Sequence, residues 1–256
     1  MSRLIETYRA VHEQAFVPLF VNDDRDSHLL VEACVEAGCR VIECTQRRKD
    51  APTLIPWIRR QFPQLHILAG STLDDDVMVH QTRRRHPQVR TLDELVDMGV
   101  DGFVSLVGWQ PDCIRKYAAT HLVIPAAMTV NEAYQQSVAG AHFIKLIGPE
   151  LGLVRLCRND AAFGFCPIFL TGGMTTERIP EAMAAGVMVV GSGFDLMLKG
   201  SPTTLPAKGV AQVVRAYLNV TREAKRKAWP ALARAEGTEL PAWLEALPHN
   251  HPFGGG

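Results

Sequence analysis

The stretch PIFLTGGMTTERIPEAMAAGVMVVGSGF, residues 167–194, decides the fold. Two short apolar runs, 167–171 and 187–191, enclose a longer amphipathic segment, and such segments in this chain space their apolar residues three and four apart, as helices do. Gly186 stands just before the second run, where glycine suits the left-handed position that follows a helix end. The stretch therefore predicts a strand, a helix and a second strand.

The same alternation recurs through residues 17–193. The short runs are continuously apolar, which suits strands of a parallel sheet that helices cover on both faces. A small residue or Met followed by Gly precedes every second run, at Gly38, Gly99, Gly140 and Gly186, and so marks an internal repeat. The eight strand candidates are FVPLFV (16–21), RVIECT (40–45), HILAG (66–70), GFVSLV (102–107), HLVIPA (121–126), HFIKLI (142–147), PIFLT (167–171) and VMVVG (187–191).

Eight strand–helix units of this size predict an α/β fold, a compact (β/α)8 TIM barrel with a helical C-terminal extension. We expect residues 1–207 to form the barrel, with an N-terminal helix and an insertion at about 74–90. Residues 208–256 form the extension, packed on the barrel or on a neighbouring subunit. The alternative is a doubly wound open sheet, but no GxGxxG follows the first run and GSGF at 191–194 lacks the third glycine.

The composition of the chain limits the classes of binding partner that we expect. The 256 residues carry 27 basic and 27 acidic side chains, so a net charge of zero gives no reason to expect nucleic acid or a membrane surface. The N-terminus lacks the layout of a secretory signal, and no apolar run approaches about 18 residues, so we expect a cytoplasmic protein. Six cysteines without a CxxC pair are expected to be thiols.

Two polar segments lie outside the repeat. Residues 74–90 include three consecutive arginines, 83–85, and we expect a solvated or subunit-facing excursion rather than a ligand site. The end HNHPFGGG carries His249 and His251, for which a mobile chain end is favoured over a metal site.

Lys145 is the most informative single residue because it interrupts the apolar run 143–147. Desolvation lowers the pKa of a buried lysine and leaves a neutral amine that can attack a carbonyl carbon and form a Schiff base. The alternative is a lysine that pairs with a carboxylate for structural reasons. Glu43 interrupts the run 41–44 in the same way, and strand alternation places Glu43, Thr45 and Arg47 on one side.

Lys145 and Glu43 are therefore expected to face each other inside the barrel, where a carboxylate beside an imine can shuttle protons. A structural ion pair of Glu43 with Arg47 is the alternative. Other polar residues follow the expected strands, namely Asp23 and Asp24 after the first and Ser71 and Thr72 after the third. TGG (Thr171, Gly172, Gly173) and GSG (Gly191, Ser192) present backbone amides ahead of helices, as a phosphate site requires.

With these residues placed, the chain resembles the 2-keto-3-deoxy-6-phosphogluconate (KDPG) and 4-hydroxy-2-oxoglutarate (KHG) aldolase family, class I. The resemblance covers about residues 15–198. It rests on five motifs in order: ECTQR for the family's Glu-x-Thr-x-Arg, AGST for its Gly-(Thr/Ser) turn, KLIGPE around its Schiff-base lysine, and LTGGM and VVGSGF for its phosphate loops.

The resemblance implies Lys145 as the imine-forming nucleophile and Glu43 as the general acid/base. It also implies a substrate-binding role for Arg47, Thr45, Ser71 and Thr72, and phosphate binding by Thr171, Gly172, Gly173, Gly191 and Ser192. A 2-oxo acid or sugar-acid phosphate would be cleaved to pyruvate and an aldehyde, without a metal or organic cofactor. Family members are commonly trimers, so the resemblance also implies a homo-oligomer.

The chain departs from the family at several points, which concern the substrate more than the imine chemistry. SLVGW (105–109) lacks the family's Ser-Pro-Gly, and Ile147-Gly148-Pro149 replaces Phe-Pro-Ala. Three alternatives stay open: a phosphate-binding isomerase, epimerase or synthase in which Lys145 only holds charge, a catalytically silent binding barrel, and a metal-dependent aldolase through Asp23, Asp24 and Glu43.

Overall fold

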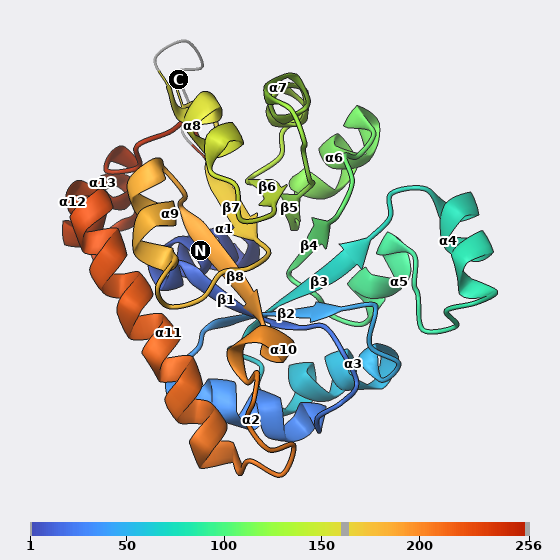
Figure 1. Ribbon diagram of the computed structural model, residues 1–256. Coiled ribbons are helices and arrows are strands. Elements are labelled where there is room, and N and C mark those ends of the chain that lie inside the picture. The colour runs from blue at the N-terminus through green and yellow to red at the C-terminus, as the bar shows by residue number, and fades with distance from the viewer. Residues whose placement is uncertain (1, 160–163, 254–256) are drawn as a thin grey trace.

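The computed structural model describes residues 2–159 and 164–253, which form eight parallel strands and the helices around them (Figure 1). Neighbouring strands are hydrogen-bonded in the order β5-β4-β3-β2-β1-β8-β7-β6. An isolated parallel bridge between Ala126, just after β5, and Lys145 of β6 closes the ring. The predicted barrel is confirmed, and the open sheet is excluded. The strands are β1 (Phe16–Phe20), β2 (Val41–Thr45), β3 (His66–Thr72), β4 (Gly102–Ser105), β5 (Leu122–Ile124), β6 (Ile144–Ile147), β7 (Ile168–Thr171) and β8 (Val189–Gly193).

Helices follow the strands around the outside of the ring. Gly38, Gly99, Gly140 and Gly186, which the sequence placed after helix ends, all have positive φ, so that prediction is confirmed. The helices are α1 (Arg3–Gln14), α2 (Ser27–Ala37), α3 (Ala51–Gln61), α4 (Asp76–Arg83), α5 (Leu92–Asp97), α6 (Pro111–Ala118), α7 (Val130–Val138), α8 (Gly152–Arg158), α9 (Ile179–Ala185), α10 (Phe194–Met197), α11 (Ala207–Ala228), α12 (Pro230–Arg234) and α13 (Leu240–Glu245).

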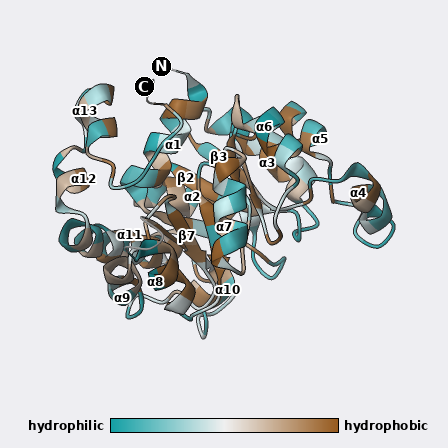
Figure 2. Cartoon of the chain, turned by 90° about the horizontal axis from the view of Figure 1, so that it is seen from above, coloured by the Kyte–Doolittle hydropathy of each residue, from teal (hydrophilic) through white to brown (hydrophobic). Residues whose placement is uncertain are grey.

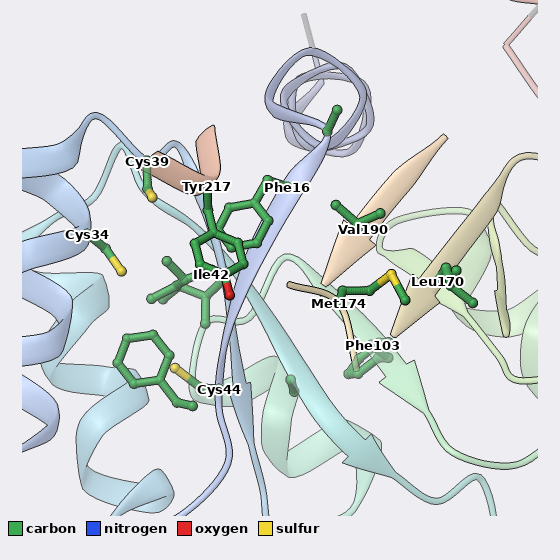
Figure 3. Packing of buried hydrophobic residues seen from close by; sticks show 14 of the residues in the cluster. Phe16, Cys34, Cys39, Ile42, Cys44, Phe103, Leu170, Met174, Val190 and Tyr217 are labelled. Carbon is green, nitrogen blue, oxygen red and sulfur yellow. The ribbon is translucent and has the colours of Figure 1, made fainter. Parts of the chain in front are cut away.

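Strand alternation divides the core into two clusters. One face of each strand packs against the helices, as Phe16 of β1, Ile42 of β2 and Phe103 of β4 do (Figure 3). The other face fills the inside of the ring, as Leu19 and Phe169 do. Hydropathy follows the same layers, with apolar residues concentrated around the strands (Figure 2). All six cysteines are free thiols, and five are buried.

The expected strand ends differ from the observed ones mainly at β4. GFVSLV was expected to run to residue 107, whereas β4 ends at Ser105 and Leu106 and Val107 lie exposed beyond it. The Ser105 hydroxyl explains this end, since it accepts a hydrogen bond from Val107 N and itself donates to Thr72 O. Apolar character alone does not distinguish a strand from an apolar loop that borders a cavity.

The predicted insertion contains α4, which stands apart from the ring (Figure 1). α5 begins after it with a capping box in which Thr91 and Glu94 bond each other's backbone amides. In the C-terminal part, α11 lies against α2 and α9, and α12 and α13 follow it. None of the helices within residues 2–159 and 164–253 combines the length and the hydropathy that a membrane span requires.

The amino ends of the strands are closed by α1 and the chain end. Tyr8 of α1 lies within ring contact of Trp243 of α13 and of Phe253, with centroids 6.0 Å and 4.9 Å away. His249 is buried and stacks on His12 at 5.1 Å, so the expectation of a mobile end is wrong for His249; Gly254–Gly256 lie outside the described residues. Contacts between aromatic rings hold this segment in place, and no pattern in the sequence indicated those contacts.

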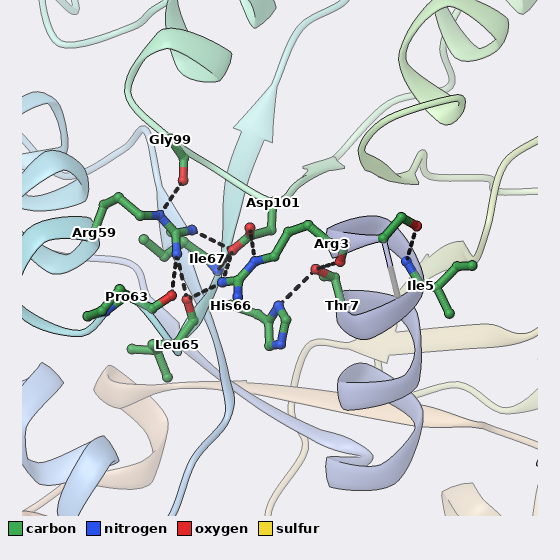
Figure 4. A network of polar contacts seen from close by, with 11 residues as sticks. Arg3, Ile5, Thr7, Arg59, Pro63, Leu65, His66, Ile67, Gly99 and Asp101 are labelled. Atoms are coloured by element: carbon green, nitrogen blue, oxygen red, sulfur yellow. Dashed lines mark hydrogen bonds and ion pairs between the residues drawn. The ribbon is translucent and has the colours of Figure 1, made fainter. Parts of the chain in front are cut away.

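A polar network fixes α1 to the same end of the ring (Figure 4). The carboxylate of Asp101, before β4, accepts hydrogen bonds from Arg3 Nε at 2.8 Å, from Arg59 of α3 at 2.5 Å and from Ile67 N at 2.7 Å. Burial alone would raise the pKa of Asp101, but these hydrogen bonds and the positive charges of Arg59 and Arg3 hold it below its usual range. These hydrogen bonds therefore hold α1 across the amino end of the barrel and keep that end closed.

Candidate active site

Lys145 lies inside the ring at the closing seam. Ile144 and Leu146 point to the helices, so the intervening Lys145 points inward and is 2% exposed. Its Nζ lies 3.8 Å from Glu43 Oε1, beyond ordinary hydrogen-bond length, and 5.9 Å from the centre of the Phe169 ring. The structure thus brings together the two residues that the sequence placed face to face.

Glu43 comes from β2 on the opposite side of the barrel and is 1% exposed. The neighbouring strand makes room for it at Gly70, because a Cβ there would lie 2.9 Å from Glu43 Cγ and Cδ. Glu43 Oε2 has no hydrogen-bond partner among the described residues. A buried carboxylate with a free oxygen is costly unless it serves a ligand or accepts a proton.

The pKa values of the pair move toward each other. Burial lowers the pKa of Lys145, and the nearby Arg47 lowers it further, while Glu43 opposes both in part. Burial raises the pKa of Glu43, against the attraction of Lys145 and Arg47. Desolvation is the first cause in both cases, and it favours a neutral amine beside a neutral carboxylic acid. These are the protonation states that attack on a carbonyl and protonation of its oxygen require.

Lys145 opens onto a cavity of about 220 Å³ at the carboxyl ends of the strands. The two glycine loops predicted to bind phosphate form one wall of it. Two exposed apolar side chains border it, since Leu106 and Ile147 are each about two-fifths exposed. The lining residues are Leu19, Val21, Arg47, Leu106, Lys145, Ile147, Thr171, Gly172, Gly173, Gly191, Ser192, Gly193, Asp195 and Leu196.

The glycine loops offer backbone rather than side chains. Ser192 lies two residues after Val190, which packs outward, and its hydroxyl lies beside Tyr217 on that outer face. A Cβ at Gly172 would come within 2.9 Å of Gly148 N, so the loop after β7 packs closely on the segment that follows Lys145. Gly148 N also donates to Thr171 O at 2.8 Å. Glycine is therefore required at position 172 for the two segments to pack together at the wall of the cavity.

Two charged residues beside these loops escaped the sequence analysis. Asp195 lies in the first turn of α10 and lines the cavity. Arg178 donates to Pro149 O at 2.7 Å and lies near Gly173. Neither interrupts an apolar run, so no signal of the kind that revealed Lys145 was present.

The end of β3 is irregular at Ser71. The register with β4 shifts between Gly70 and Thr72, and Ser71 has φ 58°, in the left-handed region that non-glycine residues rarely adopt. Ser71 Oγ is buried without a hydrogen-bond partner among the described residues. Strain and an unpaired hydroxyl at one residue are typical of a binding position.

The other expected polar residues are placed differently. The Thr45 hydroxyl donates to Phe20 O and the Thr72 hydroxyl to Val104 O, so both are engaged with backbone and neither residue lines the cavity. Arg47 does not share a strand face with Glu43, because β2 ends at Thr45 and a turn closes with Arg48 N bonded to Thr45 O. Arg47 is exposed and still borders the cavity.

The residues of the metal-dependent alternative do not converge. Asp23 and Asp24 are exposed, and Asp23 accepts a hydrogen bond from Lys49 N, while Glu43 is inside the ring. Within residues 2–159 and 164–253, no three His, Cys, Asp or Glu side chains are grouped as a metal site requires. His249 and His251 likewise form no such group.

No protein-family model matches the chain. Solved structures match it over most of its length. KDPG aldolase of Zymomonas mobilis ZM4 with 3-phosphoglycerate is 20% identical, with a TM-score of 0.64, and the match covers 86% of this chain and 97% of that one. KDPG aldolase from Legionella pneumophila, with pyruvate captured as a covalent carbinolamine intermediate, is 17% identical, with a TM-score of 0.64 and coverage of 82% and 97%.

Another matched structure is named for a different activity. Thiamine phosphate pyrophosphorylase from Pyrococcus furiosus is 11% identical, with a TM-score of 0.59 and coverage of 83% and 98%. Several matched structures are KDPG or KHG aldolases, in agreement with the resemblance found in the motifs. At these identities the likeness establishes a shared fold.

Proposed function

We propose that the protein is a class I aldolase that cleaves a KDPG-like or 4-hydroxy-2-oxo acid to pyruvate, or a related 2-oxo acid, and an aldehyde. The observation that carries the proposal is the Lys145–Glu43 pair, buried and 3.8 Å apart beside a cavity at the carboxyl ends of the strands. A structural ion pair would gain from closer contact and from hydrogen bonds to its remaining oxygen, and this pair has neither.

The neutral Lys145 amine would attack the ketone carbon of the substrate, and Glu43 would protonate the carbonyl oxygen. Loss of water gives an iminium ion, whose positive nitrogen accepts the electron pair of the carbon–carbon bond as that bond breaks. Glu43, now a carboxylate, takes the proton of the hydroxyl that becomes the aldehyde. Protonation of the enamine and hydrolysis then release the 2-oxo acid and restore both residues.

Neighbouring residues would supply the groups that bind the substrate. We assign the substrate carboxylate to Arg47, which lines the cavity, and to Ser71, which lies outside that lining near the end of β3. An anionic tail is assigned to the loops Thr171, Gly172, Gly173, Gly191 and Ser192. Thr45 and Thr72 would support the site by holding β1 and β4 through their backbone hydrogen bonds. Asp195 opposes a highly charged phosphate in the cavity, which favours a substrate with a single negative charge at that end.

The imine chemistry needs no metal or organic cofactor, because the lysine supplies the electron sink. The resemblance to KDPG aldolases also carries the expectation of a homo-oligomer, a trimer. Light scattering of the purified protein tests that expectation directly, and a monomeric mass would contradict it.

Trapping with pyruvate and borohydride tests the proposal. Intact-protein mass spectrometry of the wild type is expected to show one reduced pyruvyl adduct per chain, mapped to Lys145 by peptide digestion, and none on Lys145→Ala. Lys116→Ala removes an exposed lysine that is paired with Asp93, and it should leave the adduct unchanged. A folded wild-type protein that forms no adduct would overturn the class I proposal and would favour a phosphate-binding isomerase or synthase on the same barrel.

A further inference from the structure

A second cavity lies beside the catalytic one, and its lining is cationic. It encloses about 630 Å³ between the turn after β2 and the end of the insertion. We call it the cationic groove. Arg47 lines both cavities, so the groove begins where the catalytic cavity ends. Its lining residues are Arg47, Lys49, Pro52, Arg85, His86, Pro87, Gln88 and Arg90.

Two buried glutamines hold the walls of the groove together. Gln88 Nε2 donates to Arg47 O at 3.4 Å, and Arg90 N donates to Gln46 Oε1 at 2.5 Å. The Arg90 guanidinium in turn bonds Pro87 O and Val89 O, which fixes the bend of the insertion. These contacts span more than forty positions of sequence, so the insertion is fastened to the turn after β2 rather than free in solvent.

Among the described residues, no carboxylate forms an ion pair with the lining cations, although Arg47 also attracts Glu43 across the catalytic cavity. No carboxylate belongs to the lining as described, and two nearby carboxylates are already paired, Asp50 with Arg48 and Glu94 with Arg83. Asp23 accepts a hydrogen bond from the backbone amide of Lys49 and attracts Arg48, which does not line the groove. Arg47, Lys49 and Arg85 are exposed side chains that border one space, so their positive charges add there and attract an anion.

We propose that the cationic groove is a second anion-binding site, for a small, multiply charged oxyanion such as a phosphate ester or a polycarboxylate. The volume suits a small molecule, and arginine forks match the oxygen geometry of both groups. Arg47 couples this site to the catalytic cavity, because the same guanidinium would bind the carboxylate of the oxo acid. An anion in the groove therefore competes with the oxo acid for Arg47. That coupling rests on the proposed function, whereas the binding itself does not.

Isothermal titration at physiological salt tests the binding, with inorganic phosphate, pyrophosphate and citrate as probes. Arg85→Ala removes a lining cation, and Arg84→Ala is the matched control because Arg84 precedes it, is exposed and does not line the groove. We expect saturable binding to the wild type and to Arg84→Ala, and binding weakened about tenfold in Arg85→Ala. A preference for pyrophosphate or for citrate identifies phosphate or carboxylate as the natural group.

The outcomes separate this inference from the proposed function. Absence of saturable binding, or equal weakening by the two variants, would show only a diffuse positive field and would overturn the inference while pyruvate trapping still succeeded. Saturable binding without any pyruvyl adduct would support the anion site in the cationic groove and would overturn the aldolase proposal. If the anion site and the aldolase proposal are both correct, the bound anion is expected to raise the pyruvate concentration needed for half-maximal trapping. That rise should be smaller in Arg85→Ala.

Discussion

The barrel buries one lysine at each end, and the two are differently surrounded. Lys225, at the amino end, is 1% exposed; its Nζ donates to His12 O at 2.8 Å and to Glu236 Oε1 at 2.7 Å. Lys145, at the carboxyl end, is equally buried but has a single charged partner, Glu43, at 3.8 Å. Desolvation lowers the pKa of both amines, so burial alone does not distinguish them.

Hydrogen bonding and access make the difference. The ammonium of Lys225 is held by a backbone carbonyl and a carboxylate, and these bonds favour the charged form. The amine of Lys145 has no such bonds and borders a cavity that a ligand can enter. A buried lysine therefore indicates chemistry where its proton is poorly held and its nitrogen is accessible, and it indicates stability where the proton is fully bonded.

The largest effect is expected from exchanging each lysine for methionine. Lys145→Met should abolish the pyruvyl adduct and lower aldol cleavage by about a thousandfold or more, because no other residue supplies the nucleophile. Lys225→Met should keep the adduct and lose about 2 kcal/mol of unfolding free energy, because His12 O and Glu236 lose a charged donor. Mass spectrometry and urea unfolding measure the two effects. An adduct that still forms on Lys145→Met would show that Lys145 is not the nucleophile and would remove the proposed difference between the two lysines.

A smaller effect is expected when the carboxylates of the two pairs are changed. Glu43→Gln preserves shape but cannot move a proton, so cleavage should fall by about a hundredfold or more, and the rate should lose its dependence on the raised pKa of Glu43. Glu236→Gln, the partner of Lys225, is the matched control and should leave the rate and its pH profile unchanged. Equal pH profiles for wild type and Glu43→Gln would assign the proton transfers elsewhere.

Gly70→Ala should act through Glu43 rather than on the fold. The new methyl group would occupy the space of the Glu43 carboxylate and turn it away from Lys145, so we expect about a tenfold loss of cleavage rate. Gly152→Ala is the control, because a Cβ there meets nothing within 4 Å. If the pH profile of cleavage shifts together with the loss of rate in Gly70→Ala, Gly70 is a positioning residue. Loss of thermal stability without any change in that profile would mean a packing defect only.

The sequence predicted the barrel from its continuously apolar runs, and it predicted the Lys145–Glu43 pair from the charged residues that interrupt two of those runs. A charged residue inside a run that is apolar on both sides must point into the ring, and rings have few places for such residues to go. The position of Arg47 was mistaken because alternation was extended past Thr45, where a backbone hydrogen bond turns the chain. Gly70 and Asp195 were missed because their importance lies in contacts with distant residues, which no local pattern records.

The smallest effect on the reaction is expected at the amino end of the barrel. Burial lowers the pKa of His249 to about 4, so between about pH 4 and 6.5 the unfolded chain binds a proton that the folded chain does not. Stability should therefore fall as the pH falls through this window. His249→Gln should reduce the slope of unfolding free energy against pH by up to about 1.4 kcal/mol per unit, with the adduct on Lys145 unchanged. His80→Gln, at an exposed position of α4, is the control in urea unfolding at several pH values. An unaltered slope in His249→Gln would mean that the chain end does not stay docked on His12, and that the amino end is less firmly closed than the comparison of the two lysines assumes.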